Sequence, residues 1–289
     1  MLKKKGWKGF FCCLPAILFI GIMFFYPVFD VVRISLYESS LFQEEVSFVG
    51  LKHYKTILQD RRFLSALKNT FYFASFSVFF HLLLGLIFAS LLNQKIKFRT
   101  AGRVLHFFPW LVPQAVAAVL WLLMYQPLIG LYAQIPSWLK VIDPKPGWLS
   151  NTSTVMIAIG ITNVWKFFPF FSLNLLEGMQ VIPDELYEAE AIDGASSWYR
   201  FLYITIPHLK PVILTICMFD GVWCFSKTFD LVWLMTEGGP AGTSEILTTY
   251  IYEKAFWGES IEYAAAISVV MTLLLMGFVV IYIRTIAKK

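Results

Sequence analysis

Three long stretches of the chain contain no charged residue, and this absence limits its fold more than any other feature of the sequence. Asp, Glu, Lys and Arg are missing from residues 69–94, 104–139 and 263–283. A helix rises about 1.5 Å per residue, so about 20 apolar residues cross the roughly 30 Å hydrocarbon layer of a membrane. Only 15% of the residues are charged, against about 25% in soluble domains, which excludes an ordinary soluble protein.

Six apolar stretches are long enough to cross a membrane. We therefore predict an all-α integral membrane protein with six transmembrane helices, built as a single transmembrane domain over residues 1–289. Lys3, Lys4, Lys5 and Lys8 precede the first stretch as in a signal peptide, but the apolar run is too long and no small-residue cleavage site follows it. The predicted spans are residues 10–29, 70–92, 104–125, 155–176, 212–235 and 263–283.

The distribution of basic residues sets the predicted orientation. Six crossings place both termini on the same side of the membrane. The short connection with Lys95, Lys97, Arg99 and Arg103 has no acidic residue, and such connections stay on the cytoplasmic side. We predict a multi-pass protein of the cytoplasmic membrane with both termini cytoplasmic. The net charge of +5 follows from these flanks and requires no nucleic-acid partner.

The sequence offers no catalytic or metal-binding pattern. The cysteines Cys12, Cys13, Cys217 and Cys224 fall in predicted spans, where packing is the simplest role for them. The histidines are scattered, and neither an HExxH motif nor a nucleotide-binding P-loop occurs. We expect no catalytic residue, metal ligand or cofactor in this chain, so it is not predicted to be an enzyme.

Residues 177–211 form a long connection between the fourth and fifth predicted spans. Pro183 suits the first turn of a helix, and Asp184 and Glu185 would stabilise that end through the helix dipole. Gly194 suits a left-handed residue that ends the helix. The connection is therefore predicted to begin with a short helix followed by a sharp bend.

A second helix is predicted directly after this bend. Ser196 or Ser197 would cap it near Trp198, and Pro207 and Pro211 would end it. The resulting helix–turn–helix lies at the membrane face. It is either an interfacial hairpin that only links two spans or a docking element for another protein.

The residue pattern of this connection matches a known motif. Glu188-Ala189-Glu190, then three residues, Gly194, nine residues and Ile204-Thr205-Ile206-Pro207 resembles the EAA motif of ABC importer permeases. Glu190 and Ile206 replace the Ala and Leu of that motif. The resemblance implies a cytoplasmic coupling-helix loop that inserts into a cleft of a separate ATPase. The coupling residues it implies are Glu188, Ala189, Asp193, Gly194 and Ala195.

The resemblance extends over nearly the whole chain. Phe48-Val49-Gly50-Leu51 with Tyr54, Asn163 and Trp165 with Pro169, and Thr236–Pro240 with Tyr250-Ile251-Tyr252 are similar to segments of the sugar-permease, maltose-type branch. It implies carbohydrate uptake with four further components: a second homologous permease, two ABC ATPase subunits and an extracytoplasmic solute-binding protein. The ATPase subunits would bind ATP and Mg²⁺.

Three charged residues fall within the fifth predicted span. On one continuous helix, Asp220 and Lys227 would lie about 20° apart, with Asp230 within about 80° of Asp220. Each would cost about 2.5–3.5 kcal/mol in lipid, so this stripe should face the protein interior or a wet cavity. The charges either form internal ion pairs with Lys166 or line a solute pathway.

A pathway for a polyhydroxy solute needs hydrogen-bonding groups beside aromatic faces. The resemblance assigns such groups to three places, near Pro109–Pro113, around the Asn-x-Trp sequence and before Gly238. Lys166 departs from the family pattern, and it indicates either an acidic sugar or an ion pair with Asp220 or Asp230. The substrate-pathway residues implied are Trp110, Gln114, Asn163, Lys166, Phe167, Phe170, Phe225 and Thr228.

Together these patterns predict the permease subunit of an ATP-driven, binding-protein-dependent ABC importer for a sugar or oligosaccharide. One alternative is a stand-alone secondary transporter driven by an ion gradient, with Lys166, Asp220 and Asp230 as a relay. Another is a membrane scaffold or sensor. The ridge Ala264, Ser268 and Thr272 in the sixth span suits close helix packing, either within this chain or against a second permease.

Overall fold

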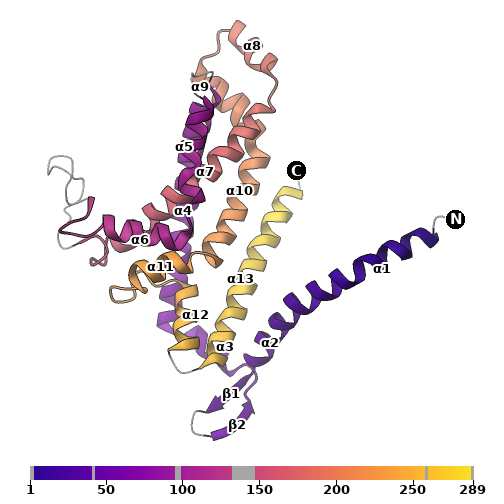
Figure 1. The fold of residues 1–289 in the computed structure, drawn as a ribbon, viewed down its shortest axis with the longest axis vertical. Coiled ribbons are helices and arrows are strands. Elements are labelled where there is room, and N and C mark those ends of the chain that lie inside the picture. The colour runs from indigo at the N-terminus through magenta and orange to yellow at the C-terminus, as the bar shows by residue number, and fades with distance from the viewer. Residues whose placement is uncertain (1–2, 41–42, 95–98, 132–146, 258–259, 288–289) are drawn as a thin grey trace. The chain divides into compact units, whose positions relative to one another are not determined.

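The computed structural model describes residues 3–40, 43–94, 99–131, 147–257 and 260–287, and most of them are helical (Figure 1). Five helices of this part are long and apolar enough to cross a membrane, or six if the bent pair of α5 and α6 is counted as one span. The prediction of a helical membrane protein is confirmed, whereas the expectation that it is all-α is not met, because a two-stranded sheet is present. The chain divides into two compact units, Met1–Arg61 with Tyr250–Ile281 and Arg62–Thr249 with Tyr282–Lys289.

The first unit begins with an exposed apolar helix. It consists of α1 (Lys3–Ile20), a π-helical turn η1 (Gly21–Phe25) and α2 (Tyr26–Ile34). Its apolar part, Cys12–Ile34, has no buried side chain within the chain. The predicted first span, residues 10–29, lies inside this longer helix.

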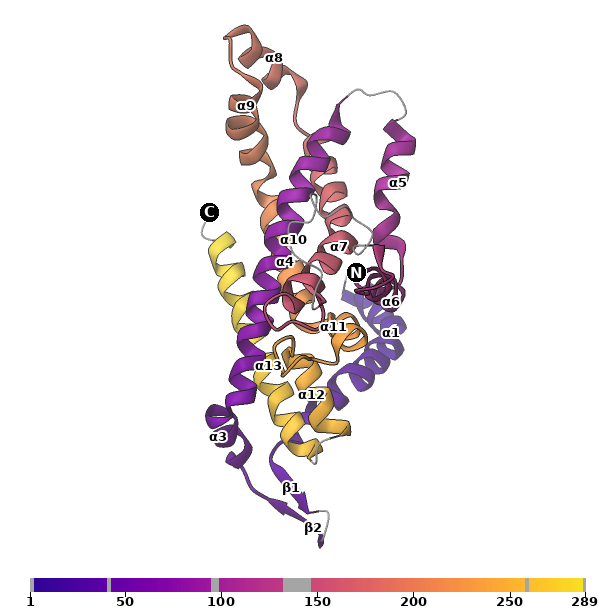
Figure 2. The same cartoon turned by 90° about the vertical axis from the view of Figure 1, so that its left-hand side faces the viewer.

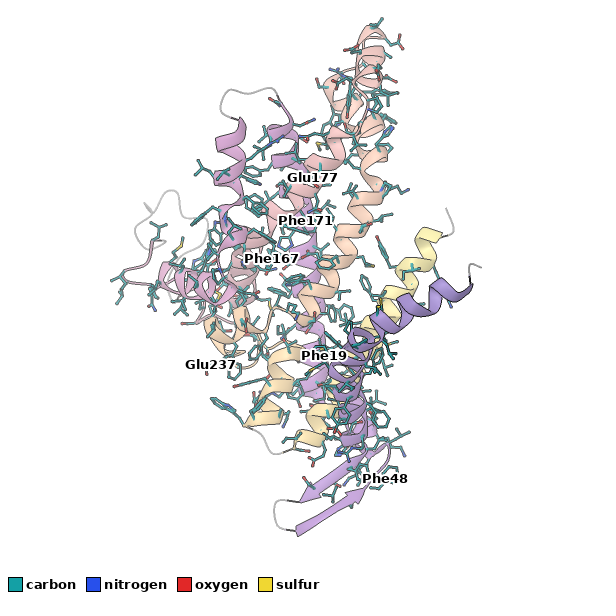
Figure 3. All side chains as sticks on the ribbon, turned by 45° about the vertical axis from the view of Figure 1, so that its right-hand side comes forward. Phe19, Phe48, Phe167, Phe171, Glu177 and Glu237 are labelled. Atoms are coloured by element: carbon teal, nitrogen blue, oxygen red, sulfur yellow. The ribbon has the colours of Figure 1, made fainter. Side chains whose placement is uncertain are left out.

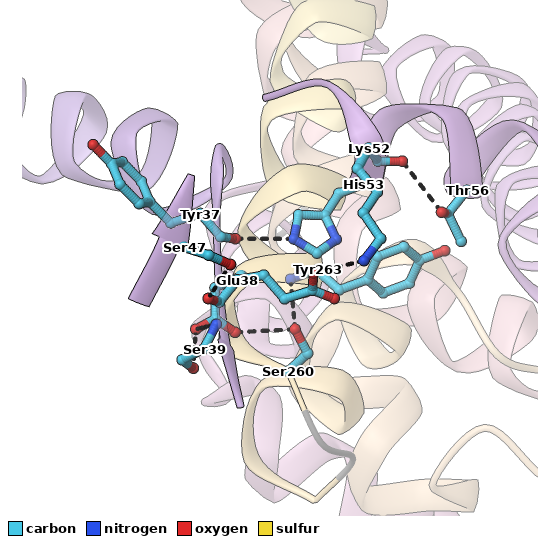
Figure 4. Close-up of polar contacts among 10 residues, drawn as sticks. Tyr37, Glu38, Ser39, Ser47, Lys52, His53, Thr56, Ser260 and Tyr263 are labelled. Carbon is cyan, nitrogen blue, oxygen red and sulfur yellow. Dashed lines mark hydrogen bonds and ion pairs between the residues drawn. The ribbon is translucent and has the colours of Figure 1, made fainter. Parts of the chain in front are cut away.

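A small outer layer of the first unit follows. Strands β1 (Tyr37–Ser40) and β2 (Gln43–Phe48) pair antiparallel, and α3 (Lys52–Gln59) comes next. His53 Nε2 lies 2.9 Å from the Tyr37 carbonyl oxygen, so α3 is fixed to the hairpin (Figure 4). The helices α12 (Leu247–Phe256) and α13 (Ile261–Ala287) join it through Asp60, which accepts bonds from Tyr250 (2.5 Å) and Tyr263 (2.7 Å).

The second unit is built around α4 (Arg61–Asn93), α7 (Val155–Gln180) and α10 (Ile206–Ser226), which lie side by side in Figures 1 and 2. Glycines allow α7 to pack closely against α4 and α10. An added Cβ on Gly85 of α4 would lie 2.6 Å from Cβ of Phe171, and one on Gly178 of α7 would lie 2.7 Å from Leu209 of α10. Phe171 and Leu209 are fully buried in the core between these helices.

The third predicted span, residues 104–125, is not one continuous helix. It is divided into α5 (Arg99–Leu111) and α6 (Gln114–Met124), whose axes are bent by 95°. Pro113 explains the break, because proline lacks an N–H and forces the residue before it out of the helical conformation. The predicted span at residues 104–125 therefore corresponds to two helices separated by a sharp bend.

The fifth predicted span, residues 212–235, is also interrupted. Helix α10 ends at Ser226, Lys227 and Thr228 form a break, and α11 (Phe229–Thr236) follows. The predicted single stripe of Asp220, Lys227 and Asp230 is wrong, because the stripe needs a continuous helix. Asp220 is buried, whereas Lys227 and Asp230 are exposed on this chain.

The contact between α4 and α7 generates a test of the packing. Gly85→Ala should destabilise the protein by about 1–3 kcal/mol, because the new methyl group overlaps Phe171. Gly277→Ala on α13 is the matched control, since nothing lies within 4 Å of its added Cβ and alanine favours a helix. Thermal unfolding in detergent measures both variants. Equal transition temperatures would contradict the close packing.

Candidate coupling segment and solute pathway

A helix–turn–helix, which we call the elbow (residues 183–205), lies at one end of the second unit (Figure 1). Helix α8 (Asp184–Ile192) starts directly after Pro183. It ends in a Schellman turn, in which the N–H of Ala195 donates to the Glu190 carbonyl (2.9 Å) and that of Gly194 to Ala191 (3.2 Å). Gly194 has φ +82°, so the predicted left-handed glycine is confirmed.

The second helix of the elbow continues into the membrane-spanning part. Ser196 accepts a bond from the N–H of Tyr199 (3.2 Å) and caps α9 (Ser197–Arg200), as predicted. The π-helical turn η4 (Phe201–Thr205) follows and leads into α10. Pro207 and Pro211 do not end the helix, and this prediction was wrong. Pro207 lies in the first turn after the wider π turn, where a missing N–H is tolerated, and α10 accommodates Pro211.

Side-chain contacts attach α8 to the start of this long helix. The Tyr187 hydroxyl lies 3.0 Å from Oγ1 of Thr205, and Arg200 donates to the Tyr187 carbonyl oxygen at 3.5 Å. Residues Ser197–Ser226 form one apolar helix of 30 residues. A displacement of the elbow therefore reaches α10 directly.

The surface of the elbow is accessible. Of the predicted coupling residues, Glu188, Ala189, Asp193 and Gly194 are exposed and Ala195 is half-buried. Apolar side chains are exposed beside them, with Ile192 at 86% and Trp198 at 68%. An open pocket at the bend is lined by Glu190, Asp193, Gly194, Ala195, Ser196 and Tyr199. Such an apolar, kinked surface suits insertion into a groove.

Lys166 occupies the break between α5 and α6. It is 5% exposed, and its Nζ donates to the carbonyl oxygens of Trp110 (3.3 Å) and Val112. These carbonyls lie at the end of α5, where Pro113 has interrupted the helical hydrogen bonds. The predicted ion pair of Lys166 with Asp220 or Asp230 is therefore wrong, because the ammonium group is bound to the backbone instead.

Several predicted pathway residues meet at this break. The rings of Trp110 and Phe170 are stacked, with centroids 6.0 Å apart and planes at 14°. Gln114 Nε2 donates to the Lys227 carbonyl oxygen (3.2 Å), which links the break before α6 to the break before α11. Trp110 is 37% exposed. The break thus combines an accessible aromatic face with polar groups.

Other predicted pathway residues are packed inside the chain. Asn163 and Thr228 are fully buried, and the hydroxyl of Thr228 donates to the Cys224 carbonyl oxygen (2.8 Å). Phe225 packs edge-to-face on Phe71 at 4.9 Å. Phe167, labelled on α7 in Figure 3, has its ring centroid 6.0 Å from that of His81.

His81 is a buried polar residue that the sequence analysis did not single out. Its Nδ1 lies 2.7 Å from Oδ2 of Asp220, and its Nε2 lies 3.2 Å from the Asn163 carbonyl oxygen. His81 is 0% and Asp220 6% exposed. A histidine in an otherwise charge-free span, together with an aspartate in another span, was the available signal.

These features define a membrane protein in which a helical elbow at one end of a bundle is continuous with a helix that leads to interior breaks. Residues 81–289 match the family described as the binding-protein-dependent transport system inner membrane component. The chain belongs to this family.

Known relatives cover almost the full length of the chain. It is 34% identical to the trehalose/maltose transport system permease protein MalF of Thermococcus litoralis, over 97% of this chain and 94% of that protein. It is 29% identical to the sn-glycerol-3-phosphate transport system permease protein UgpA of Pectobacterium atrosepticum, over 99% and 96%. The predicted resemblance to ABC importer permeases is confirmed, and the stand-alone secondary transporter is not supported.

A solved structure shares the fold. A chain from a bacterial ABC transporter involved in the import of the acidic polysaccharide alginate superposes with a TM-score of 0.83 at 21% identity, covering 98% of this chain and 96% of that chain. This likeness shows the fold. The role as a transport subunit rests on the family match and on the full-length relatives, and neither supports the scaffold alternative.

The role of Lys166 at the break can be tested by stability. Lys166→Met should destabilise the protein by about 1–3 kcal/mol, because the carbonyls of Trp110 and Val112 lose their donor. Lys227→Met, with an exposed side chain, is the control and should shift the free energy of unfolding by less than about 0.5 kcal/mol. Thermal unfolding in detergent compares them. An equal change in the free energy of unfolding for both variants would contradict the role of Lys166 in stabilising the break.

Proposed function

We propose that this chain imports a sugar or oligosaccharide across the cytoplasmic membrane, as one half of a permease pair driven by ATP hydrolysis on separate subunits. The observation that carries this proposal is the end-to-end similarity to a trehalose/maltose permease, at 34% identity over 97% of the chain. ATP-dependent uptake of radiolabelled maltose or trehalose, among other sugars, into vesicles with the reconstituted complex tests it. Uptake that persists without the ATPase subunits would contradict it.

The proposed partners are a second homologous permease, two ABC ATPase subunits that bind ATP and Mg²⁺, and an extracytoplasmic solute-binding protein. A related fold supports the last of these, because the alginate transporter was solved in complex with an alginate pentasaccharide-bound periplasmic protein. The elbow and both termini would lie on the cytoplasmic side. No cofactor is proposed for this chain.

In this proposal the elbow docks into a cleft of an ATPase subunit. Its exposed Ile192 and Trp198 would be buried there, and Gly194 keeps the turn rigid. Because α9, η4 and α10 form one helix, movement of the ATPase subunits would be transmitted along α10 towards the breaks. Motions of this kind alternate the access of a binding site between the two sides.

The solute would pass the break at Trp110, Gln114 and Phe170. Stacked aromatic faces suit the apolar surfaces of a sugar ring, and an amide suits its hydroxyl groups. Lys166 is occupied by two backbone carbonyls, so it supplies no argument for an acidic sugar. In this arrangement the solute would not contact the predicted pathway residues that are packed inside the chain, which are Asn163, Phe167, Phe225 and Thr228. They would reach the solute only after the helices move apart during transport.

Substitution of Gly194 tests the coupling role. Gly194→Val should lower the amount of sugar imported per ATP hydrolysed at least about fivefold, because a β-branched residue at φ +82° adds about 1–3 kcal/mol of backbone strain. Gly194→Asn is the control at the same position, since asparagine tolerates the left-handed conformation. Simultaneous assays of uptake and phosphate release give the ratio. Identical ratios for Val and Asn would argue against a rigid turn.

Disulfide trapping tests the docking partner. Glu188 is exposed on α8, so Glu188→Cys should form a disulfide with a cysteine placed in the proposed cleft of the ATPase subunit. Lys55→Cys, exposed on α3 of the other proposed membrane side, should form none. Non-reducing gel electrophoresis reports the adducts. If residue 188 captures no ATPase subunit while position 55 does, the proposed orientation is wrong.

A further inference from the structure

A cluster of polar side chains joins three helices in the interior of the second unit, and the proposed solute contacts do not account for it. We call it the polar joint and define it as Ser77 and His81 of α4, Asn163 of α7, and Asp220 and Cys224 of α10. Ser77, His81 and Asn163 are 0% exposed, and Asp220 is 6% exposed. Buried polar groups of this kind are expensive in a membrane, so they indicate a function.

Hydrogen-bond accounting defines the state of the joint. The Asn163 carbonyl oxygen can only accept, so Nε2 of His81 donates to it across 3.2 Å. Nδ1 of His81 and Oδ2 of Asp220 are 2.7 Å apart and must share one proton, either as imidazolium and carboxylate or as imidazole and carboxylic acid. In both cases the pair is neutral overall, which lowers the cost of burying it.

The remaining members complete the connection between helices. Asn163 Nδ2 donates to Ser77 Oγ at 3.0 Å, which is a second link from α7 to α4. The thiol of Cys224 lies 3.9 Å from Oδ1 of Asp220 and 4.0 Å from Nδ2 of Asn163. Helices α4, α7 and α10 are therefore fixed to one another at one level by bonds between side chains rather than by apolar packing alone.

The joint and the break are bonded to neighbouring turns of α7. Asp220 lies on the same long helix as Ser197, about 35 Å further along it by helical rise. Asn163 is one turn before Lys166 on α7, and Lys166 binds the carbonyls at the end of α5. A continuous series of hydrogen bonds thus leads from α10 through His81 to α7. From α7 it continues through Lys166 to the α5–α6 break, where Trp110 is partly exposed.

We propose that the polar joint positions Lys166 and the α5–α6 break with respect to α10, so that displacement of the elbow moves the break with it. The inference rests on the proposed function and names the residues that connect the elbow to the α5–α6 break. His81 and Asp220 are positioning residues in this role and do not contact the solute. Without the hydrogen bonds of the polar joint, ATP hydrolysis could proceed while the α5–α6 break stays in place.

The test uses the complete complex with its ATPase subunits and binding protein in lipid vesicles. The double variant His81→Leu/Asp220→Leu removes both polar partners together, which avoids leaving one of them buried alone and commonly preserves folding. We expect at least about a twofold increase in ATP hydrolysed per sugar imported, the lower limit for substitutions in a coupling network. Asp220→Asn should retain a wild-type ratio, since its amide can donate to Nδ1 of a neutral His81.

Ser172→Ala is the control for loss of a buried polar side chain outside the polar joint. Ser172 is fully buried on α7 and, within the described part of the chain, donates to the Phe168 carbonyl oxygen of its own helix, so the ratio should not change. A merely structural joint would lower uptake and stimulated hydrolysis in proportion. An unchanged ratio in the double variant, with wild-type import intact, would overturn the joint alone. A wild-type complex without ATP-dependent import would overturn the proposed function and the inference with it.

Discussion

The satisfaction of backbone hydrogen bonds in a medium without water is the constraint on which this structure depends. Lipid offers no partner to a free N–H or C=O, so spanning segments are helical, and any break must be satisfied by the protein itself. The break at Pro113 follows this rule, because Lys166 donates to the carbonyls of Trp110 and Val112. The break after Ser226 follows it as well, since Gln114 donates to the Lys227 carbonyl oxygen. Interior polar side chains here stabilise irregular backbone, and the irregular backbone in turn creates a place where polar and aromatic groups meet.

The same constraint explains how the buried charges are arranged. A charged side chain within a bundle is retained where it is neutralised or fully hydrogen-bonded. Asp220 is neutralised by the proton that it shares with His81, and Lys166 donates to two backbone carbonyl oxygens. Lys227 and Asp230 follow the end of α10 and are exposed on this chain. The second unit therefore contains polar contacts at two levels, one that ties α4, α7 and α10 together and one that holds the break.

The elbow shows how much local sequence can establish. Gly194 and Ser196 act through the conformation and hydrogen bonding of their own backbone neighbourhood, and each was predicted in the role that the structure gives it. Pro183 was predicted in the first turn of the helix, whereas it directly precedes the first helical residue, Asp184. The prediction was wrong for Pro207 and Pro211, because a π turn before α10 accommodates the first and a long packed helix accommodates the second. Proline signals are reliable only where no tertiary packing compensates for the lost hydrogen bond. At Pro113, by contrast, the helix does break, and α6 starts at Gln114.

Membrane insertion, the mainly helical class and the helix–turn–helix of the elbow were determined by the sequence itself, since they depend on residue type, length and spacing along one chain. Which polar groups become partners was decided only by the tertiary structure. His81 and Asp220 are 139 residues apart, and Lys166 lies more than fifty residues beyond the carbonyls that it binds. Spacing within a helix carries no information on such pairs, because the partner is selected by how separate helices pack and by which backbone groups the breaks leave without a bond.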